Sequence, residues 1–285
     1  MKIIHVISAM TVEAGGPPMV CQGLAMAQAA LGHDVTIGTV DFPGQVRITA
    51  PANIQTVAFP LHGTPRYAKS PGLKDWLETA IPQADFVHLH SIWQYPTFAT
   101  AQVCWKYQKP YVVLLNGMLD VYSIKQRNFW VKWLYWLWRE KKILSRARAL
   151  HCLNEAEIRR AVGWIANLPK FVCGNGVSSA ELATLPERGR FRAAHPEIGD
   201  RPLVLFLSRL HPKKGLDRLV PVWGKFVKRH PEAVFVVAGA GAPDYVAQLD
   251  RLIGASGMTG KIIRVGQLAG ADKWAALVDA DVFAL

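Results

Sequence analysis

The chain has 285 residues, of which 51% are hydrophobic, and carries a formal net charge of +12. This length suits two domains with separate cores rather than one. Its longest apolar runs fall short of the roughly 18 residues of a membrane helix, the first residues do not form a signal peptide, and the four cysteines lack zinc or disulfide spacing. We therefore expect a cytoplasmic protein with reduced thiols, whose positive charge favours acidic partners.

The first half of the chain alternates short apolar runs with helical segments. The apolar runs predict strands over residues 3–7, 35–40, 85–90, 111–115, 149–153 and 170–173. Strands separated by helices are typical of right-handed crossovers in a parallel sheet. Between the first strand and a helix predicted over residues 19–31, Gly15 and Gly16 would let a ligand approach the backbone, although a plain flexible turn is an equally good interpretation. We place this first domain at residues 1–178.

One stretch of this domain concentrates positive charge and aromatic residues. It covers residues 125–148 and holds one acid, Glu140, and eight basic residues: Lys125, Arg127, Lys132, Arg139, Lys141, Lys142, Arg146 and Arg148. One helical face collects Trp130, Trp133, Leu134, Leu137 and Trp138. Such a helix fits an anionic membrane surface, and a core helix flanked by snorkelling cations fits nearly as well.

The second half begins with a segment rich in glycine and proline. Residues 179–202 lack a sustained apolar period, so we interpret them as a linker. Strands are then predicted over residues 204–207, 233–238, 261–265 and 282–285, with helices between them. A second α/β domain therefore covers residues 203–285. Because the chain stops within an apolar strand, we expect this domain to be incomplete.

The first strand of the second domain leads into a candidate phosphate site. Arg209 and Lys214 lie between this strand and a helix that follows Gly215. Backbone N–H groups at a helix start favour an anion, and two cations would add full charges beside them. Either residue alone could be an ordinary surface cation. The succession of strand, glycine turn and helix favours the binding of a diphosphate.

Six motifs, in this order, resemble those of the family 4 retaining glycosyltransferases of the GT-B fold. They are Gly15-Gly16-Pro17, residues 31–35, residues 116–120, Asn175-Gly176-Val177, residues 208–215 and Gly239-Ala240-Gly241. The resemblance covers nearly the whole chain and implies an α/β protein with two Rossmann-like domains, whose parallel sheets face each other across a cleft. It further implies transfer of a sugar, with retention and without metal or cofactor, from a nucleotide-diphosphate sugar to a glycan or lipid-linked acceptor in surface polysaccharide biosynthesis.

The same resemblance assigns the site residues. Arg209 and Lys214 would stabilise the leaving diphosphate, whose negative charge grows as the glycosidic bond breaks. Asn116 stands where relatives commonly have histidine, so it can contact the donor sugar but cannot carry a proton. The glycines expected to lie near the donor are Gly15, Gly16, Gly117, Gly239 and Gly241.

Other interpretations remain open at this stage. The two glutamates that relatives carry beyond the last strand are absent, so the chain could be an inactive remnant that binds a glycan, a membrane or a partner protein. The turn at Gly239 and Gly241 lacks the third glycine of a dinucleotide fingerprint, which disfavours an NAD enzyme. The pairs Asp279/Asp281 and His88/His90 could suit a metal, but helix capping and a strand-end position explain them better. We expect no nucleic-acid partner.

Overall fold

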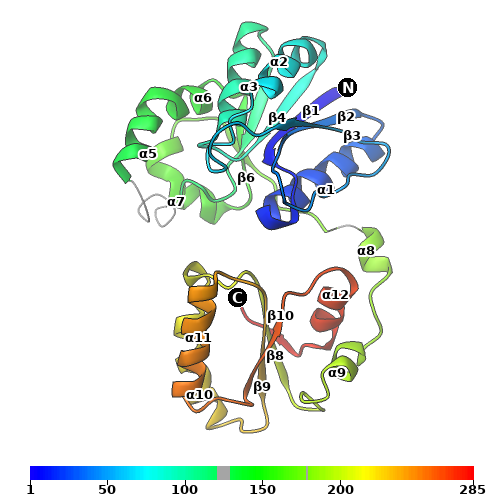
Figure 1. Cartoon of the computed structure of the whole chain (residues 1–285), viewed down its shortest axis with the longest axis vertical. Coiled ribbons are helices and arrows are strands. Elements are labelled where there is room, and N and C mark those ends of the chain that lie inside the picture. The colour runs from blue at the N-terminus through cyan, green and yellow to red at the C-terminus, as the bar shows by residue number, and fades with distance from the viewer. Residues whose placement is uncertain (121–128, 178) are drawn as a thin grey trace. The chain divides into compact units, whose positions relative to one another are not determined.

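The computed structural model describes residues 1–120, 129–177 and 179–285. The chain divides into two compact units, Met1–Ser178 and Ser179–Leu285. Each unit consists of a parallel sheet with helices packed on it (Figure 1). The predicted α/β class with two parallel sheets is confirmed. Lys125 and Arg127 of the cationic stretch lie outside the described residues.

The sheet of the first unit has seven strands within the described residues, in the order β3-β2-β1-β4-β5-β6-β7. β1 is an interior strand, because Ile3 pairs in parallel with Val35 of β2 and with Phe86 of β4. The edge strand β3 was not predicted, because its residues are mostly half-buried and form no continuous apolar run. The strands are β1 Lys2–Ala9, β2 Asp34–Asp41, β3 Gln55–Pro60, β4 Phe86–His90, β5 Tyr111–Leu114, β6 Ala149–Cys152 and β7 Lys170–Val172.

Helices cover both faces of this sheet. Along β1, Ile4 and Val6 pack in a cluster that includes α2, while Ile3 and Ile7 pack in a separate cluster with α1. α1 begins three residues earlier than predicted, because its two prolines fall in the first turn, where backbone N–H groups have no intrahelical partner. The helical segments are η1 Val12–Ala14, α1 Gly16–Ala30, α2 Pro71–Ala80, η2 Ile81–Gln83, α3 Tyr95–Lys106, α5 Phe129–Tyr135, the π-helical turn η3 Trp136–Glu140, α6 Lys141–Ser145 and α7 Glu155–Ile165.

The sheet of the second unit has four parallel strands in the described part of the chain, in the order β10-β9-β8-β11. β9 is buried along its whole length. The strands are β8 Leu203–Leu207, β9 Val234–Ala238, β10 Ile262–Gly266 and β11 Val282–Phe283, and the helical segments are α8 Ser179–Ala183, α9 Arg190–Ala194, η4 Pro212–Lys214, α10 Leu216–Val227, α11 Pro243–Ala255 and α12 Gly270–Asp279.

In both units the strand order reverses beside the unit's first strand, between β1 and β4 and between β8 and β11. Open α/β sheets bind ligands at such switch points, beyond the carboxyl ends of the strands. The loops that follow β1 and β8 are therefore the first places to look for a site. None of the helices in the described ranges has the length and hydropathy needed to cross a bilayer.

The predicted linker needs correction, because residues 179–202 hold two short helices and α9 belongs to the core of the second unit. Phe191 on α9 is only 3% exposed and packs against β8 and β9. The carboxylate of Asp279 accepts hydrogen bonds from the backbone N–H groups of Gly189, Phe191 and Arg192 at 2.5, 2.9 and 3.0 Å. Asp279 was interpreted as a cap of the helix end at which it lies, but its carboxylate instead caps the start of α9, about ninety residues earlier in the chain.

Candidate functional site

The loop between β8 and α10 carries the two predicted phosphate-binding cations. After β8 the chain passes Arg209, forms the short turn η4 that ends at Lys214, and enters α10 through Gly215, which has a left-handed φ of 73°. Both cationic side chains are exposed, and within the described ranges neither forms an ion pair or a side-chain hydrogen bond. Their charges therefore face solvent beside the start of a twelve-residue helix.

Gly239 and Gly241 follow β9 and pack directly against the backbone of this loop. A Cβ atom on Gly239 would lie 1.9 Å from the carbonyl oxygen of Ser208, and one on Gly241 would lie 2.3 Å from that of Leu210. The backbone N–H of Leu210 donates to the carbonyl of Ala240 at 2.8 Å. These glycines are thus needed for close packing of two strand-end loops, which holds the segment that bears Arg209 in place.

In the first unit, the predicted site residues lie on the loops that follow β1 and β5. Gly15 has a φ of 79° and is the N-cap of α1. Asn116 and Gly117 follow β5 with φ values of 52° and 67°, a region that asparagine and glycine tolerate best. The Asn116 side-chain amide donates to the Ser91 hydroxyl at 3.4 Å. These loops thus share the carboxyl edge of the sheet.

The carboxylate of Glu157 fixes the second of these loops. It accepts hydrogen bonds from the backbone N–H groups of Gly117 and Leu153 at 2.5 and 2.6 Å. Asn154 in turn caps α7 by accepting from the N–H of Glu157 at 2.8 Å. Sequence reasoning missed Glu157, although an N-cap asparagine followed three residues later by glutamate is the pattern of a capping box.

A hollow of about 290 Å³ lies at this edge of the sheet. Its walls include Glu13 and Ala14 before Gly15, Pro17 after it, and Ser91, the partner of Asn116. The predicted site residues therefore form two groups, one in each unit. The first contains Gly15, Gly16, Asn116 and Gly117, and the second contains Arg209, Lys214, Gly239 and Gly241. Their roles in binding and catalysis stay predictions.

A cluster of buried histidines crosses the first sheet behind this edge. His5 Nδ1 lies 2.9 Å from His90 Nε2 and His5 Nε2 lies 2.6 Å from Gln28 Oε1, while His88 lies between the rings of His5 and His151. Burial lowers the pKa of His5 to about 4, and it lowers the pKa values of His88 and His90 well below their ordinary range. These three imidazoles are therefore neutral at pH 7.

His88 and His90 were predicted only as residues at the end of a strand, and the structure places both of them in this larger cluster. Ligand atoms of His5, Cys21 and His90 lie within 4.8 Å of one another, a grouping that the spacing of His88 and His90 alone did not indicate. Burial raises the pKa of the Cys21 thiol, which therefore stays protonated and is a poor metal ligand. We interpret the group as a hydrogen-bonded core cluster.

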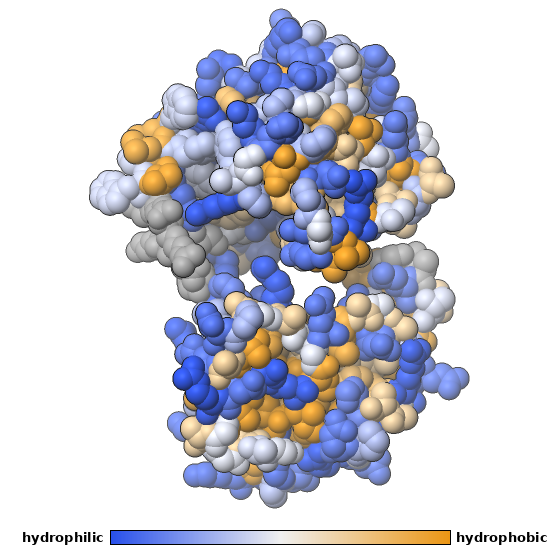
Figure 2. Space-filling view, in the orientation of Figure 1, coloured by the Kyte–Doolittle hydropathy of each residue, from blue (hydrophilic) through white to orange (hydrophobic). Residues whose placement is uncertain are grey.

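The aromatic helix of residues 125–148 is only partly a core element. Trp136 is 6% exposed and packs edge-on against Trp164 with ring centroids 4.6 Å apart. Trp130, Leu134 and Trp138 are 74%, 65% and 70% exposed, so the core-helix interpretation fails for their face. Figure 2 shows orange and pale side chains gathered over α5. We call this surface the exposed apolar face; it consists of Trp130, Val131, Trp133, Leu134, Leu137 and Trp138.

A second pocket adjoins this helix. It has a volume of about 520 Å³, and we call it the aromatic pocket; its lining residues are Thr64, Arg66, Tyr67, Ile92, Trp93, Gln94, Met118, Val131, Lys132 and Tyr135. It shares Gln94 and Met118 with the 290 Å³ hollow, so the two adjoin at the carboxyl edge of the sheet. Sequence reasoning did not find it, because its walls come from segments up to seventy residues apart.

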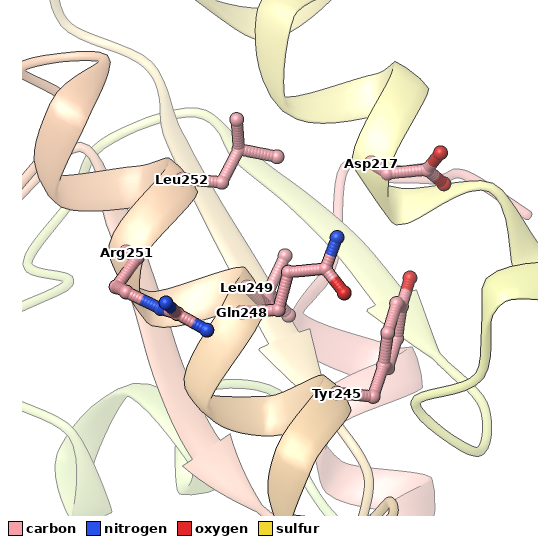
Figure 3. A pocket seen from close by; sticks show the side chains of 6 residues that line it. All are labelled: Asp217, Tyr245, Gln248, Leu249, Arg251 and Leu252. Carbon is pink, nitrogen blue, oxygen red and sulfur yellow. The ribbon is translucent and has the colours of Figure 1, made fainter.

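A third pocket, in the second unit, lies between α10 and α11. It has a volume of about 560 Å³, and Figure 3 shows Tyr245 and Gln248 extending from α11 toward the side on which Asp217 lies. Asp217 is in the first turn of α10, where a carboxylate stabilises the helix dipole. Arg209 and Lys214 do not line this pocket, so it is separate from the candidate phosphate site.

Comparisons with known proteins point to one group. Residues 15–176 match the family described as glycosyl transferase 4-like domain, and residues 187–285 match the family of glycosyl transferases group 1. A curated relative, the GDP-mannose-dependent alpha-(1-6)-phosphatidylinositol monomannoside mannosyltransferase of Mycolicibacterium smegmatis, is 32% identical over 111 residues. These residues are 39% of this chain and 28% of the relative, so the chain matches less than a third of that protein.

Solved structures share the fold. HepE of Anabaena in complex with UDP and glucose has a TM-score of 0.70 and 17% identity, over 99% of this chain and 73% of that one. Sucrose-phosphate synthase of Thermosynechococcus elongatus also has a TM-score of 0.70, with 19% identity over 99% of this chain and 75% of that one. At such low identity, the likeness shows that the two sheets and their order belong to a GT-B arrangement.

Proposed function

The chain belongs to the glycosyltransferases that carry a glycosyl transferase 4-like domain and a group 1 domain, and we propose that it moves a sugar from a nucleoside diphosphate sugar to a glycan or lipid-linked acceptor. The transfer proceeds with retention and serves the synthesis of a surface polysaccharide. In this proposal the second unit binds the donor and the first unit binds the acceptor.

One observation carries the proposal: Arg209 and Lys214 are exposed, ion-paired with no described residue, and held at the start of α10. The leaving nucleoside diphosphate gains negative charge as the glycosidic bond breaks. Fixed cations at that position stabilise the transition state more than the bound substrate, which lowers the barrier. The two side chains take the place that a divalent cation would fill, so the proposed reaction needs no metal.

In the first unit, Asn116 is proposed to contact the donor sugar and to position it. Its amide can donate and accept hydrogen bonds but does not titrate near neutral pH. The loop at Gly15 and Gly16 brings backbone groups to the same edge of the sheet. Acid or base chemistry must then come from another group, such as an oxygen of the departing diphosphate.

We also propose that the first unit rests on the inner face of the cell membrane through the stretch of residues 125–148. The exposed apolar face provides the surface that enters the lipid, and cations beside it attract anionic headgroups. Arg139 stacks on Trp138 with its Cζ atom 3.9 Å from the ring centroid, which keeps a positive charge next to this face.

Nucleotide binding tests the donor site directly. Isothermal titration of UDP and GDP should show that Arg209→Ala or Lys214→Ala weakens the binding of the preferred nucleotide by about 1.5 to 3 kcal/mol, the value of one charge-assisted hydrogen bond. Lys225→Ala is the control, because Lys225 is an exposed cation on α10 away from its start. If affinity is unchanged in both variants, the proposed donor site is wrong. Addition of EDTA should leave the affinity unchanged.

A further inference from the structure

The loop that follows β4 is held by hydrogen bonds to other segments of the first unit. The backbone N–H of Ser91 donates to the carbonyl of Leu114, at the end of β5, at 3.0 Å. The backbone N–H of Trp93 donates at 3.0 Å to the carboxyl of Glu140, at the end of η3. Of these two acceptors, the carboxyl is the one that can gain or lose a proton. The conformation of this loop can therefore depend on the protonation of Glu140.

Two residues of the loop have a strained backbone. The φ values of Ser91 and Trp93 are 80° and 72°, in the left-handed region that residues other than glycine rarely adopt. Such strain persists only where surrounding contacts hold it, and it is concentrated at functional sites. The Thr97 hydroxyl holds the first residue by donating to the Ser91 carbonyl at 3.0 Å. Glu140 holds the second, so the loss of this contact would let Trp93 return to an ordinary conformation.

The carboxyl of Glu140 is completely buried at the end of a π-helical turn, a rare element that is frequent at functional sites. Its second oxygen, Oε2, forms no hydrogen bond with any described residue. The neighbouring Arg139 is engaged elsewhere, because it donates to the Tyr67 hydroxyl at 2.6 Å and stacks on Trp138. A buried carboxylate with one hydrogen bond is costly, and protonation removes the charge. The contact between Glu140 and Trp93 is therefore most stable when the carboxyl is protonated.

The neighbours of this carboxyl do not change charge near neutral pH. Among the described residues, the titratable groups that face it are Arg139 of η3, Tyr135 of α5 and Tyr111 of β5. Burial raises the pKa values of both tyrosines, so they stay neutral, and a guanidinium stays charged. Burial also raises the pKa of Glu140 to about 7, against the smaller opposing effects of the Trp93 hydrogen bond and the Arg139 charge. Glu140 is thus the member of this group that titrates near pH 7.

The same loop leads to the candidate site of the first unit. The Ser91 hydroxyl accepts from the side-chain amide of Asn116 at 3.4 Å. Ser91 and Gln94 also line the hollow of about 290 Å³. Because Trp93 lies between these two residues in the chain, a change in its backbone conformation would move both. A proton on Glu140 can therefore affect the residue that is proposed to position the donor sugar.

We propose that Glu140 is a positioning residue whose protonated carboxyl holds the loop of residues 91–94 in place, and that loss of the proton to solvent releases this loop. Glu140 acts through Trp93 and makes the arrangement of Ser91 and Asn116 depend on pH. The folded pKa is raised above 4.5, so the contact is most stable below pH 4.5 and its contribution is lost as the pH rises through 7. The use of this loop in sugar transfer rests on the proposed function, whereas its release does not.

Hydrogen exchange at the Trp93 amide tests the release of the loop. Between pH 6 and pH 8 its protection factor should fall about tenfold in the unaltered chain, because the closed contact binds a proton that the open one lacks. Glu140→Gln keeps an acceptor oxygen but does not titrate, so its Trp93 protection should be the same at both pH values. The buried histidines act in the opposite direction, because the stability that they contribute grows as the pH rises toward 6.5.

Glu155→Gln is the matched control. It makes the same chemical change at an exposed position in the first turn of α7, so the tenfold fall at Trp93 should survive in this variant. The amide of Val87 in β4, which donates to a backbone carbonyl, should show no such fall in any of the three chains. Protection at Trp93 that does not fall with pH in the unaltered chain, or that falls equally in Glu140→Gln, would overturn the proposal.

The NMR signal of the Asn116 side-chain amide tests whether the release reaches the site. It should shift with a midpoint near pH 7 in the unaltered chain and in Glu155→Gln, and stay constant in Glu140→Gln. A constant signal in the unaltered chain would contradict the positioning role. UDP and GDP affinities of Glu140→Gln should equal those of the unaltered chain, because the proposed donor site lies in the second unit. A failure of nucleotide binding contradicts the donor site alone, and a Trp93 amide that does not respond to pH contradicts this inference alone.

Discussion

The two units use the same doubly wound plan but fill their sheets differently. Strands β8 and β9 of the second unit contain only apolar residues, and the two cations of its candidate site lie on one continuous segment from Ser208 to Gly215. The first unit buries four histidines against its sheet, and its pockets collect residues from several loops. A candidate site whose charged residues lie in one segment can be predicted from the sequence, whereas a pocket assembled from distant segments cannot.

Lowering the pH should produce the largest difference in stability between the two sheets. His5, His88 and His90 have folded pKa values below the ordinary 6.5, so the unfolded state takes up protons first and the stability of the first unit is lost as the pH falls below 6.5. Each histidine contributes up to about 1.4 kcal/mol per pH unit. Hydrogen exchange at pH 7 and pH 5.5 should show a large loss of protection in β1 and β4 and little in β8 and β9. An equal loss in both sheets would contradict this assignment.

Asp279→Ala should produce the largest effect of a single substitution, and in the second unit only. It leaves three backbone N–H groups at the start of α9 without their acceptor, at a fully buried position. We expect a loss of at least about 3 kcal/mol of unfolding free energy, measured by urea denaturation. The control is Asp272→Ala, which breaks an exposed ion pair with Arg190 and should cost less than about 1 kcal/mol. Similar losses in both variants would show that the cap is unimportant.

Glu140→Gln tests the opposite pH dependence within the first unit, because Glu140 lowers the stability of the fold as the pH rises. Because burial raises the folded pKa of Glu140 to about 7, this group favours folding most below its unfolded pKa of 4.5, and its contribution is lost as the pH rises through 7. The glutamine variant should therefore gain stability over the unaltered chain between pH 5 and pH 8, by about 2 kcal/mol. Denaturation curves at both pH values measure the difference, and a constant difference would exclude this role for Glu140.

The smallest stability effect should come from the exposed apolar face. Leu134 is 65% exposed, so Leu134→Gln should change the unfolding free energy by no more than about 0.5 kcal/mol. The same variant should bind less well to vesicles that contain anionic lipid. Trp136→Ala is the buried counterpart and should cost about 3 kcal/mol or more. Unchanged vesicle binding by Leu134→Gln would remove the membrane role of this face.

Apolar runs were enough to predict the fold class and most strands. They failed for β3, whose half-buried residues lack an apolar run, and for residues 179–202, whose breakers concealed α9. The loop with Arg209 and Lys214 was predictable because strand, turn and helix are contiguous. The contacts of Glu140 with Trp93 and of Glu157 with Gly117 were not predictable, because they join residues 47 and 40 positions apart in the chain.

The same dependence on distance applies to Asp279 and has a consequence for folding during synthesis. The N–H groups of Gly189 and Phe191 leave the ribosome about ninety residues before the carboxylate that accepts their hydrogen bonds. At usual elongation rates this delay is about 5 to 20 s. Throughout that interval α9 lacks its cap and Phe191 lacks part of its packing. The segment that joins the two units is therefore a natural place for chaperone binding or proteolysis on the nascent chain.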